Sequence, residues 1–420
     1  MRQTLFHIPH AFLGLPVFGL VSWGTLVLIV IAILALAAAR TAELRESLLK
    51  NNGFVWGAML LLNALLLPRI ETRIDDWPVG LPVRGYGVLL MLGVLFGVWV
   101  ALRRARARGI STESFFSLAT WTVVSGIVGA RLFYVVQYWD EMEGDTLVAK
   151  LFSVLQITEG GLVVYGSVIG GLAAMIFWTL RHRVSILLVA DAVTPAFFLG
   201  LAFGRIGCLL NGCCYGGVCE AELPSISFPA GSPVYEEQLS TGRILGIETE
   251  DRRIVSVKPD SWGAKKRIRE GGRIDRLSWT PVDGPNPQEP LRRPAFEGVL
   301  VVDGQTFYIP SEEVPRSSVG VHPSQIYASA GGLVLFLWTV ALSPFLLRTG
   351  TLFATGLIAY GVVRSMEEYT RVDEGGQFGT DLSISQWISA IGIAIGLAIW
   401  IFAILPKRRD RRDPSIAPSR

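Results

Sequence analysis

Long stretches of the chain carry no charged residue, and they alternate with short polar segments. A helix that crosses a membrane needs about 20 mostly apolar residues. The pattern predicts nine spans, of which the second is the weakest because it is short. They cover residues 11–39, 53–68, 85–102, 115–130, 161–180, 184–204, 323–347, 349–363 and 382–406. The expected fold class is therefore an all-α polytopic integral membrane protein.

The first of these spans has an alternative interpretation as a cleaved signal peptide, because residues 34–39 resemble a cleavage site. The apolar run is too long for that, and only Arg2 precedes it as a basic residue. We therefore expect a retained helix.

Composition agrees with a membrane protein. Only 17% of residues are charged, 51% are hydrophobic, and the mean hydropathy is +0.45. These values argue against a disordered chain or a disulfide-rich scaffold. The formal net charge of +3 gives no reason to expect a nucleic-acid partner.

The basic residues predict an orientation. They cluster after the third, fifth, seventh and ninth spans, which all end on one side, so that side is expected to be cytoplasmic. The N-terminus and the polar segment 217–320 then lie outside. The clusters are Arg103, Arg104, Arg106 and Arg108; Arg181 and Arg183; Arg348; and Lys407, Arg408, Arg409, Arg411 and Arg412.

The external segment 217–320 is long enough for one small domain and is rich in proline and glycine. Its pattern predicts a short helix over 261–269 and four strands. Residues 241–310 resemble a PDZ domain, which binds an extended peptide at a sheet edge. The alternative is an unrelated β-rich insertion. The predicted strands are 243–247, 253–257, 299–302 and 306–309.

Ionisable residues inside a membrane are functional candidates. Four arginines are expected at the outer ends of their spans: Arg131, Arg205, Arg364 and Arg371. Guanidinium groups bind phosphate in a bidentate fork, so together they suit a phospholipid head group. Each one alone could instead reach for head groups as a terminal arginine.

Two acidic residues differ in their expected partners. Arg364 and Glu368 are four residues apart on one helix and can pair. Asp191 is fourteen residues from Arg205, which is too far for pairing along the helix, so Asp191 needs another partner.

All four cysteines lie within twelve residues: Cys208, Cys213, Cys214 and Cys219. Their spacing is not a usual zinc pattern, so we favour disulfides or packing over metal binding, and we expect no metal or other cofactor.

His322 is the one histidine placed beside a span on the outer side, in the sequence His-Pro-Ser-Gln-Ile-Tyr. It could act on a substrate there. The alternative is that this sequence only begins a helix.

Several ordered motifs resemble those of the prolipoprotein diacylglyceryl transferase family. They are Leu-Phe-His-Ile-Pro at 5–9, Gly-Tyr-Gly at 85–87, Gly-Ala-Arg-Leu at 129–132, the segment 159–170, Gly-Arg-Ile-Gly-Cys-Leu-Leu-Asn-Gly-Cys-Cys-Tyr-Gly at 204–216, residues 322–327 and residues 360–368. The match leaves out two blocks, at about 15–80 and 217–320.

The resemblance implies transfer of the diacylglyceryl group from phosphatidylglycerol to the lipobox cysteine of a prolipoprotein in the bacterial inner membrane. A thioether forms and glycerol phosphate leaves. Membrane lipid and prolipoprotein signal peptides are the expected partners, and the PDZ-like pattern of the external segment adds a peptide ligand for that domain. The implied membrane core has two parts, 81–216 and 321–406, which hold seven shared spans. An extra helical pair (15–80) precedes it, and the external insertion (217–320) interrupts it. An external arm (1–14) and a basic cytoplasmic tail (407–420) form the two ends.

Together, the arginines and the resemblance give two sets of candidate residues. The expected catalytic residues are Arg205, Arg364, Glu368, His322 and Tyr165. The expected substrate-binding residues are Tyr86, Arg131, Gly166, Gly207, Asn211, Gly216, Ser324, Gln325, Tyr360 and Arg371.

The chain departs from the family at three positions. The family often has histidine at the position of Tyr165, and its signature usually has asparagine at Cys208 and glutamate at Cys213. A tyrosine has an ordinary pKa of ~10. A base would therefore be His322, Glu368 or an electrostatically assisted Tyr165.

These departures motivate one alternative, a non-catalytic receptor or scaffold that binds lipid or lipoprotein. The retained Arg205 and Arg364 argue against it. An anion transporter is a third hypothesis, which the lack of an internal inverted repeat in the sequence weakens.

Overall fold

The computed structural model describes residues 3–38, 41, 53–74, 77–139, 161, 163–219, 224–282, 293–368, 379–380 and 382–405. The chain divides into two compact units. Unit 1 comprises Met1–Leu92 and Phe203–Ile326, and unit 2 comprises Gly93–Ala202 and Tyr327–Arg420.

The chain is mostly helical, and among the described residues five helices are long and apolar enough to cross a membrane. They are α4 (Gly85–Ala107), α5 (Thr112–Gln137), α8 (Ile186–Asn211), α11 (Ser324–Leu342) and α13 (Ile384–Ile404). The other four expected spans correspond to shorter helices: α1 (Trp23–Ala38), α3 (Gly53–Leu61), α7 (Val164–Arg181) and α12 (Thr351–Glu367). This supports a polytopic membrane protein, but the expected number of nine spanning helices is not confirmed.

The predicted first span is wrong at its N-terminal end. Residues 11–16 form two short paired strands, β2 (Ala11–Phe12) and β3 (Leu15–Pro16), and the helix begins only at Trp23. Leu13 and Gly14 connect the strands with φ of 50° and 80°, a left-handed conformation that no helix continues.

The second span ends irregularly. After α3 the chain forms a π-helical turn, η1 (Leu62–Leu66), and then a 3-10 turn, η2 (Leu67–Arg69). The π turn carries the buried Asn63, whose amide donates to the Gly19 carbonyl and to the hydroxyls of Ser22 and Thr25 at the start of α1. A polar side chain thus joins the two short helices.

A small sheet near the N-terminus was not predicted. Its order is β1-β5-β4, and both pairings are antiparallel. The strand β5 leads directly into α4, and the Gly85 amide at that junction donates to the Gln3 carbonyl. The strands are β1 (Thr4–Pro9), β4 (Thr72–Ile74) and β5 (Trp77–Arg84).

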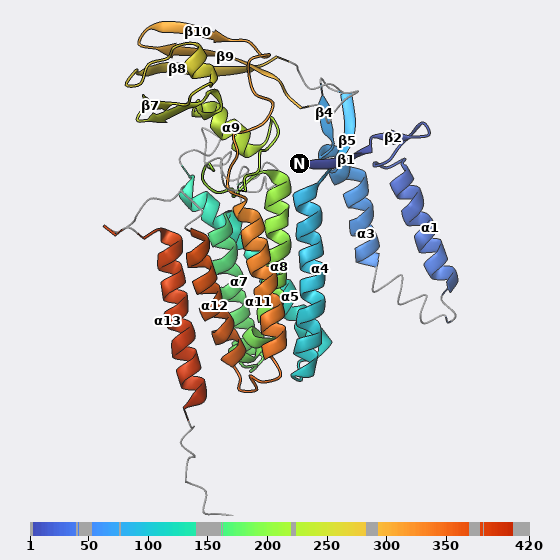
Figure 1. Ribbon diagram of the computed structural model, residues 1–420. Helices are drawn as coiled ribbons and strands as arrows, with labels where there is room; N and C mark the ends of the chain where they lie inside the picture. The colour runs from blue at the N-terminus through green and yellow to red at the C-terminus, as the bar shows by residue number, and fades with distance from the viewer. Residues whose placement is uncertain are drawn as a thin grey trace, which may run out of the picture. The chain divides into compact units, whose positions relative to one another are not determined.

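The insertion contains a three-stranded sheet, β10-β9-β8, and a separate hairpin of β6 and β7 (Figure 1). Its strands are β6 (Ile247–Glu250), β7 (Arg253–Val257), β8 (Ile274–Pro281), β9 (Phe296–Val302) and β10 (Gln305–Ile309). Its helical elements are α9 (Pro233–Ser240), η4 (Arg243–Leu245) and α10 (Trp262–Lys265).

Two of the predictions for this segment are corrected. Residues 243–245 form a 3-10 turn instead of a strand, because Gly242 and Gly246 flank it with φ of 75°. The helix expected over 261–269 is limited to α10, with Ser261 as its N-cap, and Arg267 at φ 55° follows it. The strand β8 was missed. A PDZ-like fold is not confirmed.

The insertion has its own hydrophobic core, centred on Tyr235, Leu245, Ile254 and Leu300. Burial raises the pKa of Tyr235 to about 12, so its phenol stays neutral and donates to the Pro315 carbonyl at 2.8 Å.

The two ends of the insertion meet. The Gly216 amide donates to the His322 carbonyl, and the His322 amide donates to the Gly217 carbonyl. Next to this pairing, α9 is anchored by Gln238, whose amide side chain bonds both backbone groups of Val319. The segment therefore leaves and rejoins the membrane helices at one place.

In unit 2, α5 packs against α7, and α12 lies beside α13 (Figure 1). Glycines bring α5 and α7 together: a Cβ on Gly166 would collide with the Gly129 carbonyl, and one on Gly170 with the Ser125 carbonyl. Small residues at such contacts let helix backbones approach closely.

Candidate functional site

The candidate residues fall in both units. Unit 1 contributes Tyr86, Arg205, Gly207, Asn211, Gly216, His322, Ser324 and Gln325. Unit 2 contributes Arg131, Tyr165, Gly166, Tyr360, Arg364 and Glu368. Arg371 lies outside the described residues.

In unit 1 the candidate residues gather at the C-terminal end of α8. The helix ends at Asn211, where Gly212 takes a φ of 76°. The amides of Gly212 and Cys213 both donate to the Cys208 carbonyl, which closes the last turn. This arrangement fixes the backbone that follows the signature sequence.

Arg205 lies six residues before this end, nearly two helical turns, and is half-buried. Its side chain forms no hydrogen bond or ion pair with any residue that the structure describes. A guanidinium group without a protein anion beside it is suited to bind an anionic ligand.

Gly207 has a steric role. A Cβ at this position would lie 3.0 Å from Cδ2 of Tyr86, so the glycine makes room for the tyrosine ring. The Asn211 carbonyl accepts from the Gln3 side chain at 3.2 Å, which ties the helix end to the N-terminal segment.

The loop after α8 is held by the start of α11. Ser324 Oγ donates to the Cys214 carbonyl, and Gln325 Nε2 donates to the Cys213 carbonyl, both at 2.8 Å. Gln325 is completely buried. These two side chains therefore position the loop through its backbone.

His322 lies just before α11. Its Nδ1 is 3.6 Å from Sγ of Cys219, and its backbone pairs with Gly217 and Gly216. The imidazole contacts a thiol of the adjoining loop, which the sequence did not indicate.

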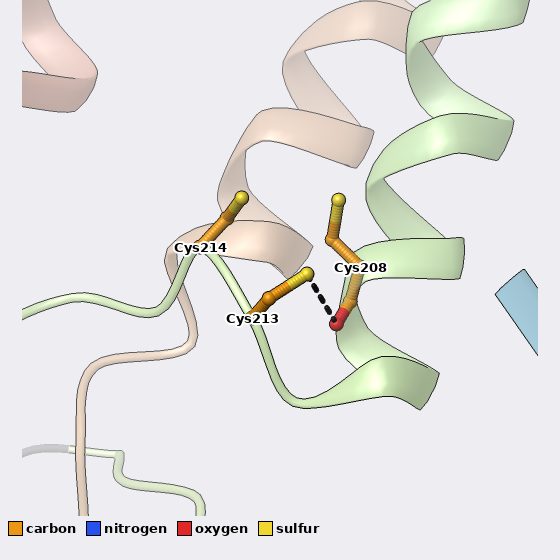
Figure 2. Close-up of side chains that lie close together, drawn as sticks. All are labelled: Cys208, Cys213 and Cys214. Atoms are coloured by element: carbon orange, nitrogen blue, oxygen red, sulfur yellow. Dashed lines mark hydrogen bonds between the residues drawn. The ribbon is translucent and has the colours of Figure 1, made fainter. Parts of the chain in front are cut away.

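The other three cysteines form a separate group. Sγ atoms of Cys208, Cys213 and Cys214 all lie within 4.8 Å of one another. Figure 2 shows the three side chains converging from the last turn of α8 and from the loop that follows it. The sequence showed that these cysteines are close along the chain but did not show that their sulfur atoms lie near one another in space.

In unit 2, Arg364 is held from two sides. Its Nη1 is 2.7 Å from Glu368 Oε2, and its Nη2 donates to Ser385 Oγ at 2.8 Å. The predicted pairing of Arg364 with Glu368 is confirmed. The contribution of Ser385 from α13 was missed, because it depends on how two helices pack.

Arg131 is also buried in unit 2. Its Nη1 donates to the Gly161 carbonyl at 3.1 Å, and its guanidinium carbon lies 5.1 Å from the centre of the Tyr134 ring. The backbone of Gly161 has a φ of 74°, and a Cβ there would approach both side chains closely. The backbone carbonyl and the ring thus orient the arginine.

The remaining candidates of unit 2 differ in exposure. Tyr165 is 58% exposed on the first turn of α7. Gly166 beside it contacts α5, so its lack of a side chain serves helix packing. Tyr360 on α12 packs against the rings of Phe197 and Phe198, with centroids 6.1 Å away in each case.

Asp191 has the partner that its burial requires. Its Oδ2 accepts from Arg108 Nη1 at 2.8 Å and from the Gly350 amide at 2.7 Å, and its Oδ1 accepts from the Phe353 amide. The carboxylate therefore links α4, α8 and the start of α12. This role is structural.

Comparison with known proteins gives consistent results. The family model described as prolipoprotein diacylglyceryl transferase matches residues 77–402. A phosphatidylglycerol–prolipoprotein diacylglyceryl transferase of Rhodopirellula baltica is 38% identical over 440 residues, covering 94% of this chain and 88% of that protein. Because that match spans 94% of the chain, it extends across the insertion and much of the N-terminal segment.

Two further relatives carry the same kind of name. A phosphatidylglycerol–prolipoprotein diacylglyceryl transferase 2 of Clostridium perfringens is 34% identical over 166 residues, covering 38% of this chain and 62% of that protein. One of Clostridium tetani is 24% identical over 321 residues, covering 76% of this chain and 93% of that protein.

Proposed function

This chain belongs to the prolipoprotein diacylglyceryl transferase family, and we propose that it transfers the diacylglyceryl group of phosphatidylglycerol to the lipobox cysteine of prolipoproteins. In this reaction the cysteine thiol gives up its proton and its sulfur attacks the glyceryl carbon. The bond from that carbon to the phosphate oxygen breaks, and glycerol phosphate leaves with the bonding electrons. The receptor and transporter alternatives are not favoured by these relationships.

The assignment of the site rests on one observation, the half-buried Arg205 guanidinium that bonds no described residue. Arg205 has no anionic partner among the residues that the structure describes, so its guanidinium is suited to hold the phosphate of the lipid. It would stabilise the charge that develops on the leaving glycerol phosphate. Removing one such donor typically lowers a rate by about 100- to 1,000-fold.

Arg364 is proposed to neutralise phosphate charge as well. Glu368 and Ser385 then act as positioning residues, because each holds one nitrogen of the guanidinium. A bidentate phosphate contact depends on the plane of this group, so fixing it favours binding.

For proton transfer we propose His322. A neutral imidazole has one nitrogen that accepts a proton and one that donates, so the His322 side chain can take up the proton of a thiol. The Glu368 carboxylate is engaged by Arg364, with Oε2 2.7 Å from Nη1. Of the three candidates, His322 is therefore the one we assign as acceptor of the thiol proton.

The test is a transfer assay with the purified full-length protein in detergent. Phosphatidylglycerol and a lipobox peptide are added, and mass spectrometry follows the diacylglyceryl mass on the peptide. We expect Arg205→Ala and Arg364→Ala each to lower the rate at least about 100-fold. Arg276→Ala, at an exposed position on β8, is the matched control and should retain the full rate.

The outcomes separate the activity from the site. No product from the unchanged protein would contradict the transferase assignment. Product at the full rate from a well-folded Arg205→Ala variant would leave the activity standing and show that the phosphate is held elsewhere.

The chain is a multi-pass membrane protein, and we propose that it resides in the bacterial inner membrane with its site facing the outer leaflet. The basic clusters on one side of the predicted spans support this orientation. The tail 407–420 is then cytoplasmic, and the insertion 217–320 is external.

The insertion is proposed to bind an extended peptide. In its three-stranded sheet β9 is central, so β8 and β10 are the edges, and an added strand would pair with such an edge.

A further inference from the structure

We propose that Cys208, Cys213 and Cys214 bind one thiophilic metal ion, Zn²⁺ or Cu⁺, at the end of α8. Thiolate sulfur is the ligand that these two ions prefer. The three Sγ atoms come from the last helical turn and the loop beyond it and lie within 4.8 Å of one another, and Figure 2 shows them close together, with the Cys213 thiol donating to the Cys208 carbonyl.

The distances suit a single ion. Three thiolates that each lie about 2.3 Å from one zinc ion are separated from one another by roughly 4 Å. The sulfur atoms are already within 4.8 Å of one another. The remaining gap between the sulfur atoms is at most about 1 Å.

The backbone around the cluster is fixed. The amides of Gly212 and Cys213 bond the Cys208 carbonyl, while Ser324 and Gln325 hold the carbonyls of the two loop cysteines. Binding a metal ion therefore requires little ordering of the chain.

Cys214 adopts a strained conformation. Its φ is 56°, in the left-handed region that glycine or asparagine usually occupies. Strain of this kind at a side chain that could bind a ligand points to a functional requirement.

A buried acceptor beside the cluster gives a second, independent observation. Gln325 is completely buried, and its Oε1 has no hydrogen-bond partner among the described residues. The nitrogen of the same amide is bonded to the Cys213 carbonyl, so Oε1 lies next to the loop that carries the thiols. An unpaired buried acceptor is costly, and a water molecule bound to the metal ion would satisfy it.

Sequence spacing had favoured disulfides or packing. The structure instead brings an odd number of thiols together and leaves Cys219 outside the group, beside His322. One disulfide within the group would leave a third thiol over, whereas one metal ion uses all three.

The test measures bound metal directly and does not depend on the transferase activity. The full-length protein is purified in detergent under reducing, oxygen-free conditions without a histidine tag. It is then equilibrated with Zn²⁺ or, in a second arm, with Cu⁺, and passed through a desalting column. We expect one ion per chain by elemental mass spectrometry in at least one arm, and the arm that retains it identifies the ion.

Spectroscopy and thiol labelling identify the ligands. Co²⁺ in place of zinc should give thiolate-to-metal charge-transfer absorption, and bound metal should protect three cysteines from a maleimide while Cys219 reacts. Serine variants at 208, 213 and 214 should each lose the ion. Cys219→Ser is the matched control and should retain one ion per chain.

Several results would overturn the proposal. They are no retained ion in either arm, equal loss of metal in Cys219→Ser, or a disulfide between two of the three cysteines in the protein as purified. A serine variant counts only if its gel-filtration profile and thermal unfolding match those of the unchanged protein. The Cys213→Ser and Cys214→Ser variants, which alter the loop and not α8, keep the test decisive if Cys208→Ser fails to fold.

Discussion

A single carboxylate, that of Asp191, joins three segments of unit 2. It is completely buried and accepts from the Arg108 guanidinium and from two backbone amides. Removing it would leave a largely buried cation and two amides without an acceptor. This is one of the few arrangements in which a single substitution is strongly destabilising.

We therefore expect Asp191→Ala to lower the stability of the protein by about 3 kcal/mol, the lower end of the usual range because the Arg108 side chain is 21% exposed. Thermal unfolding in detergent, followed by tryptophan fluorescence, measures the change. Glu113→Ala removes an exposed carboxylate from the first turn of α5 and should change the stability by less than about 1 kcal/mol. Equal effects of the two substitutions would contradict the role of Asp191.

For single residues, a side chain's partner could be predicted from the sequence only when the two lie close together along the chain. The Arg364–Glu368 pair was predicted because four residues on one helix are spatial neighbours. The need of Asp191 for a partner was also clear, but its partner Arg108 lies 83 residues earlier. In the same way, the sulfur cluster depends on the backbone turn at Gly212 and Cys214, which spacing alone does not reveal.

At the scale of elements, the contact of α5 with α7 depends on glycines. Gly166 has the clearest role, since a Cβ there would meet both the Gly129 carbonyl and the Phe133 side chain. The two helices would have to separate to accept any larger residue, and close backbone contact stabilises helix pairs in membranes.

Gly166→Ala should therefore lower the thermal unfolding temperature in detergent, and Gly166→Val should lower it further. Gly200→Ala on α8 is the matched control, because among the described residues no atom outside the local backbone of α8 lies within 4 Å of a Cβ at that position. There the substitution should be neutral or slightly stabilising, since alanine favours a helix over glycine by about 1 kcal/mol. If Gly166→Ala unfolds at the same temperature as the unchanged protein, the packing role is wrong.

Elements with long apolar runs were predicted well, and short ones poorly. The uncharged runs indicated α4, α5, α8, α11 and α13, because hydropathy over 20 residues dominates any local preference. The strands β2 and β3 were missed because they lie in the apolar run that begins at residue 11. Their pairing depends on the turn at Leu13 and Gly14, which an apolar pattern does not indicate. The pairing of β1 with β5 joins segments about 75 residues apart, which no local pattern reports.

For the whole molecule, the insertion consists of two parts with different relations to unit 1. The first is a base made of α9 and the segment 314–322. Gln238 of α9 bonds both backbone groups of Val319 and so holds the base together. The Tyr215 hydroxyl, in the loop after α8, donates to Glu237 Oε2 at 3.1 Å and ties the base to that loop. The second is a distal lobe, residues 243–313, which holds the strands β6 to β10 and packs its core on Tyr235 and Leu239 of α9.

This division gives a prediction that separates the two parts. Replacing 243–313 by a short glycine–serine linker removes the core residues that pack on Tyr235 and Leu239 of α9 but keeps the bonds of Gln238 and Tyr215. It should leave the transfer of diacylglycerol to a lipobox peptide within about threefold of the unchanged rate, because the loop after α8 keeps these supports. Extending the deletion to 230–316 removes α9 and the Gln238 anchor, and should lower the rate at least about tenfold.

Gln238→Ala, in the otherwise complete chain, should reproduce part of that loss, since it leaves both backbone groups of Val319 without their partner. Equal loss from the two deletions, in proteins that insert and elute normally, would instead mean that the distal lobe takes part in the reaction.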